Sequence, residues 1–110
     1  MSFRHILPGA VALAISFTSL AFTAPAFAAD HAVEIKGMAF SVPALKVAVG
    51  DTVTFTNRDG APHTATAKDR SFDTGRLAKG QSAKVTIAKA GVFDYFCAVH
   101  PSMKARVTAK

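Results

Sequence analysis

The sequence is poor in several residue types, and each shortage limits what the protein can be. It has one cysteine among 110 residues and no tryptophan, so no disulfide can form within the chain. Acidic residues number 7 against 13 lysines and arginines, a formal net charge of +6. The basic residues stand one or two at a time, which argues against nucleic-acid binding. After residue 28, no stretch has the apolar spacing of an amphipathic helix.

The segment before Asp30, the first acidic residue, has the organisation of a secretory signal peptide. A basic residue near the start precedes an apolar stretch at 11–22, and a small-x-small tripeptide at 26–28 marks the expected cleavage site. A permanent membrane anchor is the alternative, but serines and threonines interrupt the apolar stretch, which would span a bilayer poorly. We therefore expect residues 1–28 to be removed and residues 29–110 to form one soluble domain in the periplasm.

The expected mature domain is small enough to need a stabilising element. A domain of roughly 80 residues buries a modest core and usually relies on a disulfide, a metal or a very regular sheet. Cys97 has no partner for a disulfide, and a free thiol is a liability in an oxidising compartment. A bound metal is therefore the obvious candidate. The remaining positive charge serves solubility or attracts an acidic partner surface.

Hydrophobic and polar residues alternate along five short segments, which is the period-two pattern of half-buried strands. Turn signals rich in Gly, Asn and Asp separate these segments, and the least regular residues, 68–78, are expected to form a long loop. Short strands at regular spacing indicate a β-sandwich or a barrel. The five segments are 33–36, 45–49, 52–56, 84–87 and 104–109.

The most informative segment has the strand–loop–strand pattern and covers residues 93–107. Cys97, His100 and Met103 lie there with the spacing Cys-x2-His-x2-Met, so one short loop offers a thiolate, an imidazole and a thioether. A second imidazole is available at His63, just after a turn signal. Two histidines, a cysteine and a weak axial methionine are the ligands of a blue-copper electron-transfer site. Each residue alone has an ordinary structural explanation, and their conjunction carries the prediction.

The parity of residues along the strands adds a prediction about two side chains. Asn57 shares a face with the apolar residues of 52–56, so its side chain should point inward and satisfy its polar groups by bracing the ligand loop. Cys97 shares a face with Tyr95, which places the thiolate inside the apolar end of the domain.

Three stretches of the mature chain resemble the cupredoxin family, specifically its amicyanin and plastocyanin group. They are residues 49–57, the sequence Ala-Pro-His-Thr at 61–64, and residues 91–103, whose two-residue gap between histidine and methionine is the short amicyanin-type loop. The resemblance implies a Greek-key β-sandwich of about seven to eight short strands. It also implies an electron carrier whose redox partners are a periplasmic dehydrogenase or a c-type cytochrome. The implied cofactor is one type 1 copper, with the ligands His63, Cys97, His100 and Met103.

Three positions depart from the family pattern. Thr64 stands where related proteins usually carry Asn after the first histidine, and its hydroxyl could still join the two ligand loops. Val99 and Ser102 stand where Pro and a bulky Phe are common in amicyanins. These departures bear on the redox potential and the partner, and they leave the four expected ligands in place.

Two other classes of function deserve comparison. A periplasmic copper-delivery protein would use the same ligands, but such carriers usually offer open Met- or His-rich sites. An enzyme would need an orienting group and an oxyanion hole or an open coordination position, and the sequence indicates none. We therefore expect a monomeric, non-enzymatic electron carrier. His100 would be its electron port, set in an apolar docking patch formed by Ala61, Pro62, Val99 and Pro101.

Overall fold

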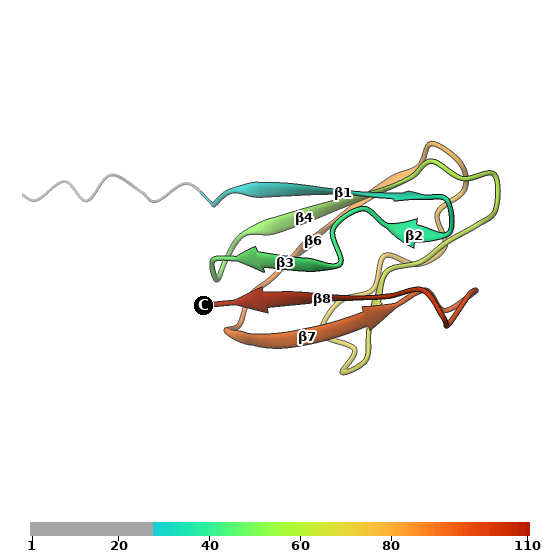
Figure 1. Cartoon of the computed structure of the whole chain (residues 1–110). Coiled ribbons are helices and arrows are strands. Elements are labelled where there is room, and N and C mark those ends of the chain that lie inside the picture. Colours follow the sequence, from blue (N-terminus) through green and yellow to red (C-terminus); the bar gives the residue numbers. More distant parts are fainter. Residues whose placement is uncertain (1–27) are drawn as a thin grey trace, which may run out of the picture.

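The computed structural model describes residues 28–110, which form eight β-strands and no helix (Figure 1). Apart from its last residue, the expected signal peptide at 1–28 lies outside the described residues. Within the part that is described, no helix is long and apolar enough to cross a membrane.

The strands form two four-stranded sheets, one ordered β2-β1-β4-β6 and the other β3-β8-β7-β5. β1 pairs with β4 and β3 pairs with β8 in parallel, and the remaining neighbours are antiparallel. The structure thereby confirms the predicted all-β sandwich. The strands are β1 (Asp30–Lys36), β2 (Ala39–Phe40), β3 (Ala44–Val47), β4 (Thr52–Asn57), β5 (Thr66–Ala67), β6 (Ser82–Thr86), β7 (Gly91–Phe96) and β8 (Lys104–Ala109).

Each of the five segments with alternating hydrophobicity overlaps a strand, and the alternation matches burial. In β4 the buried and half-buried residues alternate strictly, with valine, phenylalanine and asparagine inward and threonines outward. Residues 68–78 have no regular strand, as expected. Isolated bridges of Asp73 with Thr66 and of Leu77 with His63 fasten this segment to the domain.

An aromatic cluster fills the space between the two sheets. The Tyr95 ring of β7 lies at its centre, and the nearest ring centroid, that of Phe40, is 4.7 Å away. Phe55 of β4 and Phe72 of the irregular segment complete the cluster. This packing therefore draws on both sheets and on the long connection. The loops that follow β4 and β7 leave the sandwich at the end of the domain farthest from the termini (Figure 1).

Candidate metal centre

Three of the four predicted ligands meet at that far end of the sandwich. Nδ1 of His63 lies 3.6 Å from Sγ of Cys97, Nδ1 of His100 lies 3.8 Å from the same sulfur, and the two Nδ1 atoms are 3.2 Å apart. His63 follows β4, and the other two residues lie in the loop between β7 and β8. Among residues 28–110 this is the one group of three or more His, Cys, Asp or Glu side chains arranged to hold a metal ion.

The spacing of these three atoms suits a metal ion. A point equidistant from them lies about 2 Å from each, the length of a metal–nitrogen bond and close to that of a metal–thiolate bond. Nε2 of His63 lies 2.9 Å from the Asp59 carboxylate. That contact orients the ring and leaves Nδ1 facing the centre, where it can bind a metal ion.

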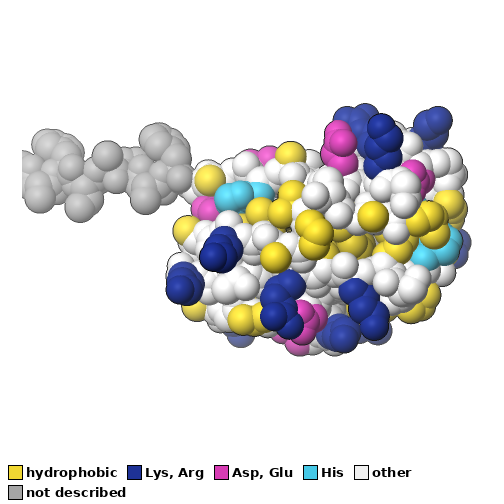
Figure 2. Space-filling view, viewed as in Figure 1, with side chains coloured by type: hydrophobic (Ala, Val, Ile, Leu, Met, Phe, Trp, Pro, Cys, Tyr) yellow, Lys and Arg dark blue, Asp and Glu magenta, His cyan; other side chains and the backbone are white. Residues whose placement is uncertain are grey.

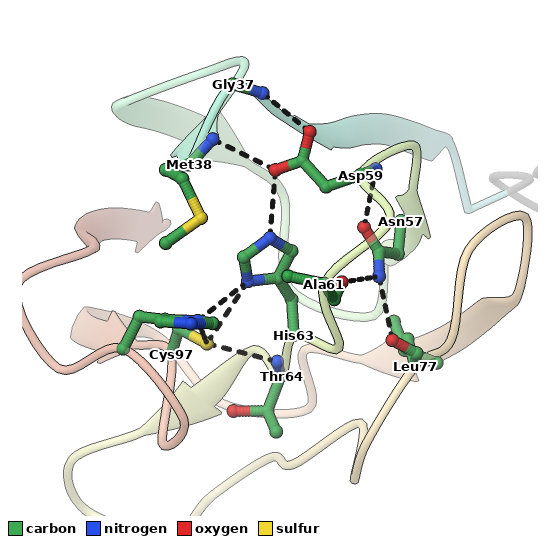
Figure 3. Close-up of polar contacts among 10 residues, drawn as sticks. Gly37, Met38, Asn57, Asp59, Ala61, His63, Thr64, Leu77 and Cys97 are labelled. Carbon is green, nitrogen blue, oxygen red and sulfur yellow. Dashed lines mark hydrogen bonds and ion pairs between the residues drawn. The ribbon is translucent and has the colours of Figure 1, made fainter.

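Asp59 joins this ligand to the turn between β1 and β2. Its carboxylate accepts the backbone N–H groups of Gly37 and Met38 at 2.8 and 2.9 Å, in addition to Nε2 of His63 (Figure 3). The N–H groups of Met38 and Gly37, followed by His63, hold the pKa of Asp59 below its usual range. Met38 has a φ of 59°, a left-handed conformation that is uncommon for a side chain of this kind, and the carboxylate stabilises it.

Asn57 braces the ligand loop from inside, which confirms the prediction from parity. Its side chain is fully buried, and Nδ2 donates to the backbone oxygens of Ala61 and Leu77, each at 2.8 Å. Oδ1 accepts the N–H of Asp59 at 2.9 Å (Figure 3). The amide therefore spans the turn that carries His63 and satisfies its own polar groups.

The Cys97 thiol is fully buried, as predicted. Its sulfur accepts the N–H of Thr64 at 3.3 Å. Burial raises the pKa of this thiol, but the Thr64 N–H and the imidazoles of His63 and His100 outweigh that effect and lower the pKa to about 6. The site thus favours a thiolate, which is the form that binds metals.

Thr64 joins the two ligand loops, as its hydroxyl was expected to do. The hydroxyl accepts the N–H of Ala98 at 2.8 Å and lies 2.9 Å from the hydroxyl of Thr66. The Thr66 hydroxyl in turn donates to the Asp73 carboxylate at 3.0 Å. A continuous chain of hydrogen bonds therefore runs from the residue after Cys97 to the long irregular segment.

Met103 and His100 occupy different environments in the same loop. Met103 is buried, and its backbone closes the loop, because its oxygen accepts the N–H of Cys97 at 3.0 Å and its N–H donates to His100 at 2.9 Å. The His100 ring is half-buried. Met103 lies at the end of the loop that holds Cys97 and His100, and its role as a ligand stays a prediction.

Sequence reasoning missed three residues of this region: Asp59, Thr66 and Asp73. The signal for Asp59 was present, since an acidic residue four positions before a candidate ligand histidine can orient its ring. Thr66 and Asp73 had no comparable signal, because their contact depends on how the irregular segment folds back over β5.

The fold and the donor set define a class of small copper-binding β-sandwiches. The family described as "Cupredoxin-like domain" matches residues 9–109, so this chain belongs to the cupredoxin-like family. Within it, amicyanin from Paracoccus denitrificans is 34% identical over 109 residues, covering 93% of this chain and 83% of the relative. Amicyanin-alpha from Methylorubrum extorquens is 30% identical over 83 residues, covering 71% and 70%.

Solved structures agree with this placement. A variant of amicyanin in its oxidised state superposes with a TM-score of 0.69 at 32% identity and covers 76% of this chain and 90% of its own. A copper-containing nitrite reductase from Thermus scotoductus SA-01 has a TM-score of 0.68 at 29% identity. This chain spans only 22% of that enzyme, although the match covers 74% of this chain. The resemblance to the amicyanin group is confirmed, and copper is the cofactor that fits the donor set.

Proposed function

We propose that this chain is a periplasmic electron-transfer protein with one type 1 copper bound by His63, Cys97, His100 and Met103. The observation that carries the proposal is the triangle of two Nδ1 atoms and one Sγ atom around a common point. Amicyanin structures in an oxidised form and with Cu(I) support the redox assignment. When bound, copper supplies one-electron chemistry by alternating between Cu(II) and Cu(I).

The protein's part in this function is to keep the donor atoms in one arrangement. Asn57 and Asp59 hold His63 from two sides, and Thr64 fixes the distance between the two ligand loops. Because these bonds do not depend on the charge of the metal, the ligands need to move little when an electron arrives or leaves. Small rearrangement favours rapid electron transfer, and the burial of Cys97 and His63 keeps water away.

Met103 completes the proposed ligand set. Support comes from its burial at the end of the ligand loop and from its backbone bonds to Cys97 and His100. With four protein ligands no coordination position remains for a substrate, so we propose that the protein is a carrier and not an enzyme. The closed, buried site also favours metal retention over the alternative role in copper delivery.

The proposed electron port is the half-buried ring of His100. The neighbouring patch contains exposed Pro62 and Pro101 and half-buried Ala61 and Val99. At the end of the domain that carries these loops, a surface histidine has hydrophobic side chains beside it (Figure 2). Small apolar surfaces of this kind suit the weak encounters of redox proteins. The partner would be a redox protein such as a dehydrogenase or a c-type cytochrome. This chain would bind its partner as a monomer.

The periplasmic location and the domain boundaries belong to the same proposal. The signal-peptide pattern at 1–28 supports export and cleavage after Ala28. The described β-strands begin at Asp30, so residues 29–110 would retain every strand of the sandwich.

The first test is the visible absorption spectrum of residues 29–110 after addition of Cu(II). We expect an intense blue colour that mild reductant bleaches and that Cys97→Ser abolishes, whereas Ser102→Ala in the same loop keeps it. A colourless protein that still binds copper tightly would contradict electron transfer. Rapid loss of copper to a chelator would then favour delivery.

A further inference from the structure

Two nitrogen atoms near the start of β1 contact one carboxylate, at the end of the sandwich opposite the copper loops (Figure 1). The main-chain N–H of Ala29 donates to Oδ1 of Asp51 at 3.0 Å, and Nε2 of His31 lies 2.9 Å from Oδ2 of the same carboxylate. Asp51 is 6% exposed and also accepts the N–H of Ala48. Hydrogen bonds from His31, Ala48 and Ala29 hold the pKa of Asp51 below its usual range.

Cleavage after Ala28 would change the chemistry of this end. It would make the nitrogen of Ala29 an α-amino group and His31 the third residue of the chain. An amino terminus, the next two peptide nitrogens and an imidazole at the third position can all bind one metal ion in a plane, because each link between them closes a five- or six-membered chelate ring. Planar nitrogen coordination of this kind suits Cu(II) and Ni(II).

We propose that the processed amino terminus, Ala29-Asp30-His31, is a second metal site that prefers Cu(II) and also binds Ni(II). The donors are the α-amine of Ala29, the peptide nitrogens of Asp30 and His31, and Nδ1 of His31. Binding to the neutral imidazole form releases three protons, one from the ammonium and one from each peptide nitrogen. The inference rests on the cleavage that forms part of the proposed function.

The orientation of His31 supports this assignment. The Asp51 carboxylate engages Nε2, so Nδ1 remains for a metal, and a carboxylate on the outer nitrogen is the usual support for a ligand histidine. The same arrangement occurs at the first site, where Asp59 engages Nε2 of His63 at 2.9 Å.

The position of β1 in its sheet makes the donors accessible. β1 pairs with β4 from Asp30 onward, but β2 pairs only with Ile35 and Lys36. Among the described strands, the first half of β1 therefore has one neighbour. Ala29 and Asp30 are exposed and His31 is half-buried. Metal binding would compete with the Asp51 contact of Ala29 and with the first two pairs of the β1–β4 ladder, and would leave the rest of the sheet intact.

The test is a Ni(II) titration of residues 29–110 reconstituted with Cu(I), which prefers the thiolate site. Glycine in the buffer removes loosely bound nickel. The matched control carries one extra glycine before Ala29, which moves His31 to the fourth position and leaves the fold unchanged. We expect one equivalent of Ni(II) to give the absorption of a planar nitrogen complex and to shift the amide NMR signals of Thr52 and Val53. The control chain with the extra glycine should show neither effect.

Two results would overturn the inference: equal nickel binding by the two chains, or none by the mature chain. The exported protein's intact mass and amino-terminal sequence give a separate check, since any first residue other than Ala29 would remove this site in the cell. Neither result would alter the Cu(II) spectrum that tests the proposed function. Conversely, loss of the blue colour with retained nickel binding would overturn electron transfer alone.

Discussion

The two ends of the sandwich use the same pair of side chains to different effect. At each end an aspartate lies 2.9 Å from Nε2 of a histidine, Asp59 with His63 and Asp51 with His31. At the copper end that histidine is fully buried and faces a thiolate and a second imidazole. At the other end the histidine is half-buried and is the second residue of β1. An oriented histidine is therefore common to both ends, and enclosure beside a thiolate and a second imidazole distinguishes the redox site.

The largest expected effect comes from removing the buried brace. Asn57→Ala leaves the oxygens of Ala61 and Leu77 without a donor and the N–H of Asp59 without an acceptor. We expect the free energy of unfolding to fall by about 3 kcal/mol, measured by urea denaturation of the metal-free protein. Asp51→Ala at the other end should cost less, because water can reach its donors. Equal losses of unfolding free energy in the two variants would contradict this difference between the two ends.

A smaller effect is expected from Asp59→Asn, which keeps the shape of the side chain and removes its charge. The amide can no longer accept all three hydrogen bonds that the carboxylate accepts. We expect Cu(I) affinity to fall about 10- to 100-fold, measured by competition with a chromophoric chelator. Asp51→Asn is the control and should leave this affinity unchanged. An unchanged affinity in Asp59→Asn would show that ring orientation does not limit metal binding.

The Tyr95 hydroxyl lies between the two ends and is an exception among the buried polar groups. Among the described buried side chains, it is the one polar atom without a hydrogen-bond partner, and burial raises the pKa of this phenol. Tyr95→Phe should therefore raise the free energy of unfolding by about 1 kcal/mol, measured by urea denaturation. The copper spectrum should not change. A loss of stability would mean that the hydroxyl makes a contact with buried water.

The smallest expected effect concerns the outer face of β7 and β8. Nε of Arg106 donates to Asp94 at 2.7 Å, and this bond lowers the pKa of Asp94. A carboxyl whose pKa is lowered by folding stabilises the fold above its unfolded pKa and loses that contribution as the pH falls through its folded pKa. Asp94→Asn should therefore slightly flatten the acid side of the stability–pH profile in the metal-free protein. If the variant and the parent protein had the same stability–pH profile, the Arg106–Asp94 pair would contribute no stability.

The sequence allowed the strands and the ligand loop to be predicted because both depend on local patterns. Alternation in 52–56 specified which residues face the core, and it also placed Asn57 inside. The short strand β2 could not be foreseen, since two residues carry no period and pair only because their neighbours hold them. Asp59 illustrates the same limit, because two of its three partners lie in a turn formed more than 20 residues earlier.

The parallel pairing of β3 with β8 has a consequence for how the protein folds. β8 is the last of the described strands and lies between β3 and β7 in the second sheet. An emerging chain therefore cannot complete that sheet until β8 is available, and such distant pairings slow folding. The loop with Cys97, His100 and Met103 directly precedes β8. The ligands would consequently meet only as the last strand inserts, so a truncated chain would lack the second sheet and the metal centre together.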